Sequence, residues 1–309
     1  MTARRHHYIP QCYLKGFAEV RDRPQLFVVD AKERRSFYTW IGNIAVELDF
    51  HRIDAPGQPL DVLEKKIAES EGELAPALER VIAARSISDQ DNRSQLFMLM
   101  GLLCLKNPRR RKSVNQVAEK LAKVFLGTKV ATPERWHAEM ERAKAEGHID
   151  KDADAEAIRK LILNDGFRFA LTTPAHLQME FGGLERILPY IFGRKWVLCK
   201  VDSGAVGFVT SDCPVCVMWQ DPKEQAPAGL GLMGTQIVFP ISNDLAMIGT
   251  FELDGGEMDA DEDFVSKVNG NIILHSNRQV YARSGDFLYQ LQHNATVMHG
   301  MDLLSDAVL

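Results

Sequence analysis

The sequence predicts an α+β fold, with an N-terminal β-hairpin region, a central helical block and a mainly antiparallel C-terminal sheet. Two observations predict this fold. Short runs of β-branched, aromatic and other apolar residues, bounded by turn residues, lie near both ends of the chain, whereas apolar residues recur at helical spacing through the middle. Strands and helices are therefore separated along the chain, unlike the alternation of βα units. We expect a single domain over residues 1–309, with a β-rich part at 1–55, a helical block at 56–193 and a second β-rich part at 194–309.

The N-terminal part is expected to contain a β-hairpin. Residues 25–30 and 35–40 have the composition of strands, and the four residues between them suit a hairpin loop. Residues 43–50 are expected to add a third extended piece. The segment before the hairpin, residues 5–17, carries two histidines, two tyrosines and a proline. Chain termini are usually frayed, so we expect a terminus of this composition to be held on the core.

In the central block, the apolar pattern predicts a series of helices. The first spans about residues 60–82, and Pro76 is expected to divide or kink it. The second begins at the cap-type residues 88–91 and is apolar on every side from Leu96 to Leu105, which is typical of a helix in the centre of a core. Further helices are expected at 114–126, 133–146, 154–163 and 172–188, the last of them interrupted at its two adjacent glycines.

From Lys195 onward the pattern is that of strands. An acidic stretch at 252–263 is expected to be a surface loop, and residues 264–276 are expected to form a helix. The strands are expected at 196–201, 205–210, 215–219, 235–240, 245–252 and 279–282.

Composition places the chain among ordinary globular proteins. Its 309 residues are 45% apolar and 26% charged, with a net charge of −5, so any nucleic-acid partner needs a local basic patch. The five cysteines are odd in number and irregularly spaced, which favours a reducing compartment. No apolar segment follows Met1 as in a secretory signal, and the longest apolar run, at 96–105, is too short to span a bilayer. We therefore expect a cytoplasmic protein with no membrane partner.

Two segments carry residue types that suit catalysis or metal binding. His6 and His7 could supply a metal ligand or a general base, although neighbours on a strand point to opposite faces. Ser211 and Asp212 follow an apolar run, at a position where sites are often built, and Asp212 could be a ligand or a base. The alternatives are a histidine pair packed near a terminus, and a turn in which Ser211 or Asp212 bonds the backbone before Pro214.

A basic region and two helical carboxylates complete the candidates. Between residues 106 and 129 there are eight Lys or Arg and one Glu, and Arg109, Arg110 and Arg111 are consecutive. Such a cluster can hold phosphates, or it can be a solvated helix end. Glu64 and Glu71 lie seven residues apart on one helix face, where they could support a divalent ion or form salt bridges.

Several familiar sites are excluded. Cys213 and Cys216 have C-x-x-C spacing, but no second pair exists to complete a zinc site and no βαβ context supports a redox role. Residues 150–161 begin like a calcium loop but lack glycine at the sixth position and glutamate at the twelfth. The chain contains no P-loop, G-x-G-x-x-G, G-x-S-x-G or H-E-x-x-H motif.

These segments together resemble a family of bacterial and fungal proteins, domain-of-unknown-function family 4238. The likeness covers nearly the whole chain. The chain differs from the usual residues of the family at Cys12, His51 and Cys213, which argues against a functional role for the two cysteines. The family has no assigned activity, so the resemblance supports the choice of residues and implies no reaction. The matching positions are 6–17, Glu64 with Glu71, 107–111, 211–215, 239–242, and Asn269 ahead of 280–282.

Three functions remain open. The first, which the residue types favour, is a metal-dependent nuclease or phosphodiesterase. In it His6 or His7 acts with Asp212, one divalent ion is held by His7 and Asp212, and Glu64 and Glu71 support it. Arg109, Arg110 and Arg111 would then bind phosphate, and Ser211 and Asn269 would belong to the same site.

The second is a non-catalytic sensor or adaptor with a protein partner, in which the same residues form a buried network that locks the N-terminus onto the core. The third is binding of nucleic acid through residues 106–129 without cleavage. Exposure discriminates the first two, because a catalytic site must open to solvent whereas a structural network is closed.

Overall fold

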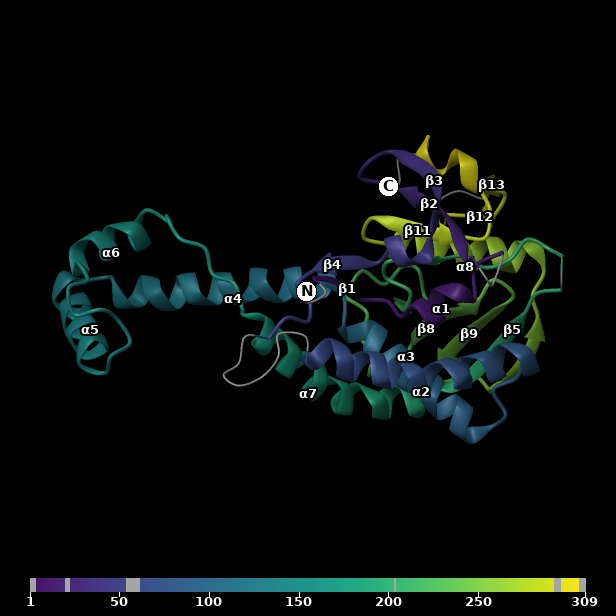
Figure 1. Cartoon of the computed structure of the whole chain (residues 1–309), viewed down its shortest axis with the longest axis horizontal. Coiled ribbons are helices and arrows are strands. Elements are labelled where there is room, and N and C mark those ends of the chain that lie inside the picture. Colours follow the sequence, from purple (N-terminus) through teal and green to yellow (C-terminus); the bar gives the residue numbers. More distant parts are fainter. Residues whose placement is uncertain (1–3, 20–22, 54–61, 203, 292–295, 306–309) are drawn as a thin grey trace. The chain divides into compact units, whose positions relative to one another are not determined.

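The computed structural model describes residues 4–19, 23–53, 62–202, 204–291 and 296–305. The chain divides into two compact units, one formed by residues 1–107 and 177–309 and the other by 108–176. The α+β class is confirmed, with the N-terminal hairpin, the central helices and the C-terminal sheet in the predicted order. Figure 1 labels these elements along the chain.

The first unit contains most of the helices and all of the described strands. Its helices are α1 (Gln11–Lys15), α2 (Val62–Ala84), α3 (Gln90–Leu105), α7 (Thr173–Phe192), which enters it at residue 177, and α8 (Glu262–His275), with short 3-10 helices at Ile41–Asn43 and Gly300–Leu304.

Two helices that could have been divided, at Pro76 and at Gly182–Gly183, are continuous. The helix α2 runs unbroken through Pro76, and α7 runs unbroken through Gly182 and Gly183. Proline in a helix removes one backbone hydrogen bond, but the residues that follow Pro76 pack into the main core. Tertiary packing of an apolar face supplies most helix stability in proteins, and here it outweighs the local signal.

A five-stranded sheet with the order β10-β5-β9-β8-β7 forms the centre of the first unit. All pairs in it are antiparallel except β10 with β5. Alternate residues of its strands enter two different cores, so that Leu198 packs with the helices α2 and α3 while Cys199 packs with α8. Figure 1 shows these helices on opposite sides of the sheet. The strands are β5 (Lys195–Lys200), β7 (Cys216–Trp219), β8 (Thr235–Ser242), β9 (Leu245–Thr250) and β10 (Gly256–Asp259).

The predicted hairpin belongs to a second sheet, of four strands in the order β3-β2-β11-β6. The strand β11 lies between the hairpin and β6, so it joins the two ends of the chain, with Tyr281 opposite both Val28 and Thr210. The strands are β2 (Gln25–Asp30), β3 (Arg35–Trp40), β6 (Thr210–Ser211) and β11 (Gln279–Ala282). Two smaller pairs are β1 (Arg5–His7) with β4 (Val46–Leu48), and β12 (Leu288–Tyr289) with β13 (Met298–His299).

Two predictions in the C-terminal part are wrong. Of the strand expected at 205–210, only Thr210 is in a strand, because the segment before it packs on a loop: the Phe208 N–H donates to the Asn243 carbonyl at 2.6 Å. A Cβ atom at Gly207 would lie 2.1 Å from that same carbonyl oxygen, so only glycine allows this approach. The acidic stretch expected to be a loop contains β10, which pairs with β5 and forms one edge of the five-stranded sheet.

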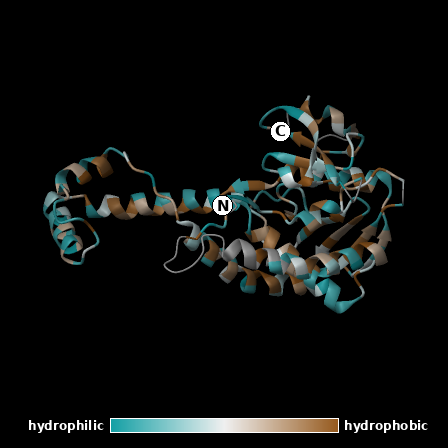
Figure 2. Cartoon of the chain, viewed as in Figure 1, coloured by the Kyte–Doolittle hydropathy of each residue, from teal (hydrophilic) through white to brown (hydrophobic). Residues whose placement is uncertain are grey.

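The second unit is helical, with α4 (Pro108–Lys129), α5 (Pro133–Ala145) and α6 (Ala155–Leu163). Its small core centres on Trp136, whose indole N–H donates to the Ala155 carbonyl. Thr132 and Asp154 cap α5 and α6 through their side-chain oxygens. Figure 2 shows hydrophobic and hydrophilic residues alternating along α4. Within the described ranges, no helix is both long and apolar enough to cross a membrane.

Candidate functional site

The N-terminal segment is held firmly on the first unit. Its strand β1 pairs with β4, and the side chains of Tyr13, Leu14 and Phe17 are fully buried. The Tyr13 hydroxyl donates to the Pro240 carbonyl and lies 2.8 Å from the Thr210 hydroxyl. The position of this segment is therefore fixed by packing and by hydrogen bonds to β6 and β8.

The two candidate histidines are neighbours on β1, but their side chains lie in different surroundings. His6 is buried, and its Nδ1 accepts a 2.8 Å hydrogen bond from the backbone N–H of His51. The two rings stack in parallel with centroids 5.3 Å apart. His7 is half-buried, and its Nε2 lies 3.1 Å from the side-chain amide nitrogen of Gln11. As expected for neighbours on a strand, their side chains have different surroundings.

Asp212 ties the turn after β6 to the start of β11. Its carboxylate oxygens accept the backbone N–H groups of Asn277 and Gln279, at 2.8 and 3.2 Å. The Asn107 side chain donates to the Asp212 carbonyl at 2.9 Å. The Ser211 hydroxyl accepts the backbone N–H of Cys213, which is the turn geometry that the sequence offered as one alternative for this segment.

Asn269 has a similar role in the helix α8. It is fully buried, and its amide nitrogen donates to the carbonyls of Gly207 and Leu288 while its oxygen accepts from the Val209 N–H. One side chain thus satisfies three backbone groups, two in the segment before β6 and one in β12.

A cluster around Asp30 was not predicted. The Asp30 carboxylate is 1% exposed and accepts hydrogen bonds from the Arg278 guanidinium and from the Gln279 amide, with a further bond from the Glu33 N–H. Arg278 lies 248 residues along the chain. No local pattern could have paired these residues, although a carboxylate that ends an apolar strand was a weak signal.

Of the predicted site residues, Glu71 lines a cavity of about 370 Å³ in the first unit, which we call the Tyr8 cavity. Its wall is mostly apolar, and such walls with a few polar groups are usual for small-molecule sites. Burial, with a contribution from the nearby Asp212 carboxylate, raises the pKa of Tyr8. The lining residues are Tyr8, Pro10, His51, Ile67, Glu71, Glu73, Leu74, Gln95, Met98, Leu102, Leu103, Leu105, Lys106, Leu177, Glu180, Phe181 and Leu184.

The two helical carboxylates and the basic cluster are placed only in part. The Glu71 carboxylate lies 3.6 Å from the Lys106 ammonium, whereas the side chain of Glu64 is outside the described residues. Arg109, Arg110 and Arg111 begin α4 in the second unit, with Arg109 exposed and the other two half-buried. Further along α4, part of the positive charge is paired: Lys123 contacts Glu119 and Asp165.

Two of the five cysteines, Cys12 and Cys216, are in surroundings that disfavour the reactive thiolate. Burial raises the pKa of Cys12 to about 11 and raises that of Cys216 strongly, so both stay thiols at neutral pH. Among the residues that the structure describes, no three His, Cys, Asp or Glu side chains are grouped so as to hold a metal ion.

Comparison with known proteins identifies the family. The family model described as "Protein of unknown function (DUF4238)" matches residues 5–286, which is most of the chain. The protein belongs to the DUF4238 family. No curated protein and no solved structure matches it significantly. Membership of DUF4238 assigns no activity, so the function has to be argued from the geometry.

Proposed function

We propose that this DUF4238 protein is a non-catalytic sensor or adaptor, in which the candidate polar residues lock the N-terminal segment onto the core. The supporting observation is that these side chains are buried and hydrogen-bonded within the protein. His6, Asp212 and Asn269 are 1%, 4% and 0% exposed, and each accepts hydrogen bonds from backbone N–H groups. A catalytic group must meet its substrate, whereas buried side chains that satisfy backbone hydrogen bonds stabilise a fold.

The Tyr8 cavity supplies the sensing element of this proposal. Tyr8 and Pro10 belong to the N-terminal segment, and both line the cavity together with residues of α2, α3 and α7. A small, largely apolar molecule in the cavity would contact the N-terminal segment directly. Its binding would stabilise the locked position of that segment, because a ligand that binds one state shifts the population toward it.

One observation favours a second candidate, a nuclease or phosphodiesterase. His51, Glu71, Lys106 and Glu180 line the same cavity, and imidazole, carboxylate and ammonium groups are the usual participants in acid–base and phosphoryl chemistry. In that case Glu71 would act as a base or help to hold a divalent ion.

An activity assay separates the two proposals. Purified protein is incubated with bis(p-nitrophenyl) phosphate, and separately with single- and double-stranded DNA and RNA, in the presence of Mg²⁺, Mn²⁺ or Zn²⁺. We expect the wild type and the Glu71→Gln variant to give the same background rate. Cleavage by the wild type that falls by about 10²-fold or more in Glu71→Gln, but persists in the matched variant Glu79→Gln on the exposed face of α2, would establish the enzyme instead.

A further inference from the structure

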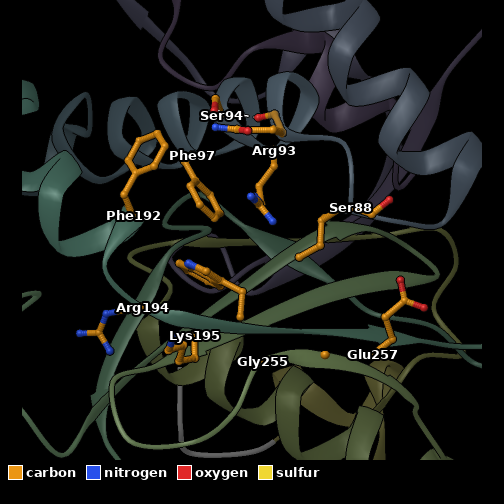
Figure 3. Close-up of a pocket in the computed structure, with 13 residues that line it drawn as sticks. Ser88, Arg93, Ser94, Phe97, Phe192, Arg194, Lys195, Gly255 and Glu257 are labelled. Atoms are coloured by element: carbon orange, nitrogen blue, oxygen red, sulfur yellow. Dashed lines mark hydrogen bonds between the residues drawn. The ribbon is translucent and has the colours of Figure 1, made fainter.

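A second cavity of the first unit has the features of an anion site. It measures about 470 Å³, and residues of α3, the C-terminal end of α7, the start of β5 and the start of β10 line it (Figure 3). We propose that this cavity, called the Arg93 cavity, binds an anion that carries a planar ring and has the size of a nucleoside monophosphate. The proposal does not depend on the Tyr8 cavity or on the sensor function.

The charges around the Arg93 cavity favour an anion. Arg93, Arg194 and Lys195 line it, and within the described part of the chain none of the three forms an ion pair with a carboxylate. The one acidic residue in the wall, Glu257, is paired with Lys200. Arg93 and Lys195, with Arg194 behind them, face one carboxylate that is already paired, which gives a positive potential in the cavity.

Arg194 supplies a fixed charge and does not reach the ligand. It is 4% exposed, and its guanidinium donates to the carbonyls of Thr235, Gly249 and Leu230 and to the Thr235 hydroxyl. These hydrogen-bond partners are neutral, but the nearby Glu252 carboxylate also acts on Arg194 and offsets part of its charge. Figure 3 shows the guanidinium of Arg194 pointing away from that of Arg93.

Arg93 is the residue placed to bind the anion. Its half-buried side chain extends from α3 toward the opposite wall of the cavity (Figure 3), and among the described residues its guanidinium has no hydrogen-bond or ion-pair partner. A guanidinium fork matches phosphate and carboxylate groups with two parallel hydrogen bonds. Lys195, which is exposed, adds a second cation at the mouth.

An aromatic wall accounts for the planar ring in the proposal. Phe192 is 48% exposed and meets the buried Phe97 edge to face, with centroids 5.1 Å apart. Phe97 packs in turn on Trp196 at 5.1 Å. The exposed ring of Phe192 is thus backed by Phe97, which itself packs on Trp196, and exposed aromatic rings of this kind can stack on nucleobases. Cavities of this volume are of the size that accepts small-molecule ligands.

Calorimetric titration of the full chain with adenosine 5′-monophosphate tests the proposal. Adenosine, which lacks the anion, and inorganic phosphate, which lacks the ring, serve as comparators. We expect one site for the nucleotide and at least about tenfold weaker binding of either comparator. Arg93→Gln and Phe192→Ala are each expected to weaken nucleotide binding by about tenfold or more. Arg186→Gln, on the exposed face of α7, is the matched control and should bind as the wild type does.

Two results would overturn the proposal. One is the absence of nucleotide binding at millimolar concentration. The other is binding that is unchanged in both Arg93→Gln and Phe192→Ala, when melting curves show that both are folded. A 5′-phosphorylated tetranucleotide distinguishes the source of the ligand: affinity equal to that of the mononucleotide indicates a free nucleotide, whereas tighter binding that still requires Arg93 indicates the end of a strand.

Discussion

Replacing Asp212 with alanine is expected to lower the free energy of unfolding by about 3 kcal/mol. The carboxylate is 4% exposed and accepts two backbone N–H groups, from Asn277 and Gln279. Hydrogen bonds to a charged acceptor contribute about 1.5–3 kcal/mol each, and buried donors that lose their acceptor cost more than a lost contact between neutral groups. Denaturation by urea, followed by circular dichroism, measures the difference.

The matched control for this variant is Asp254→Ala. Asp254 is exposed and has no side-chain hydrogen bond or ion pair in the described structure, so its replacement should change stability by no more than about 0.5 kcal/mol. If Asp212→Ala unfolded at the same urea concentration as the control, Asp212 would not be a structural residue.

Replacing Asp30 is expected to have a comparable effect, with a distinctive pH dependence. Asp30→Ala should cost about 2–3 kcal/mol, because the Arg278 guanidinium and the Gln279 amide lose a buried charged acceptor, while Arg278 itself is 39% exposed and still contacts Glu33. Burial alone would raise the pKa of Asp30, but the hydrogen bonds from Arg278, Gln279 and the Glu33 N–H outweigh burial and lower it.

The sign of the pH dependence follows from this lowered pKa. The unfolded chain binds the proton more tightly than the folded one, so the stabilisation by Asp30 is complete above the unfolded pKa of about 3.9 and is lost as pH falls through the lower folded value. Wild-type stability should therefore decline below about pH 4, and the decline should be smaller in Asp30→Asn. Equal slopes for the two proteins in urea titrations between pH 2 and 5 would contradict the assignment.

The elements that the sequence predicted well are those with local signals. The hairpin strands 25–30 and 35–40 have a composition typical of strands and are joined by a short loop. Thr132 and Asp154 are N-cap residues that mark the starts of α5 and α6. The continuity of α2 through Pro76 and the position of β10 depend on packing and pairing with distant segments. The local sequence pattern alone therefore predicts neither the continuity of α2 nor the position of β10.

The candidate site was predictable to the same extent. The sequence pattern indicated His6, Asp212 and Asn269 as candidates. Their burial and hydrogen bonding, however, depend on partners that lie far away in the chain. The Arg93 cavity was missed because its cations are separated by about 100 residues and Arg93 looks like any charged residue of a helix. The tied-down N-terminus, in contrast, could be expected from its aromatic composition alone.

Metal content, measured together with thermal stability, tests most directly whether His6, His7 and Asp212 form structure and not a metal site. The wild type, His7→Ala and Asp212→Ala are analysed by mass spectrometry for bound metal, and each is melted with and without EDTA. We expect EDTA to leave every melting temperature unchanged, and Asp212→Ala to melt earlier than the wild type without any change in metal content. One equivalent of metal in the wild type that is absent from both variants would contradict the structural assignment and support the metal-dependent enzyme.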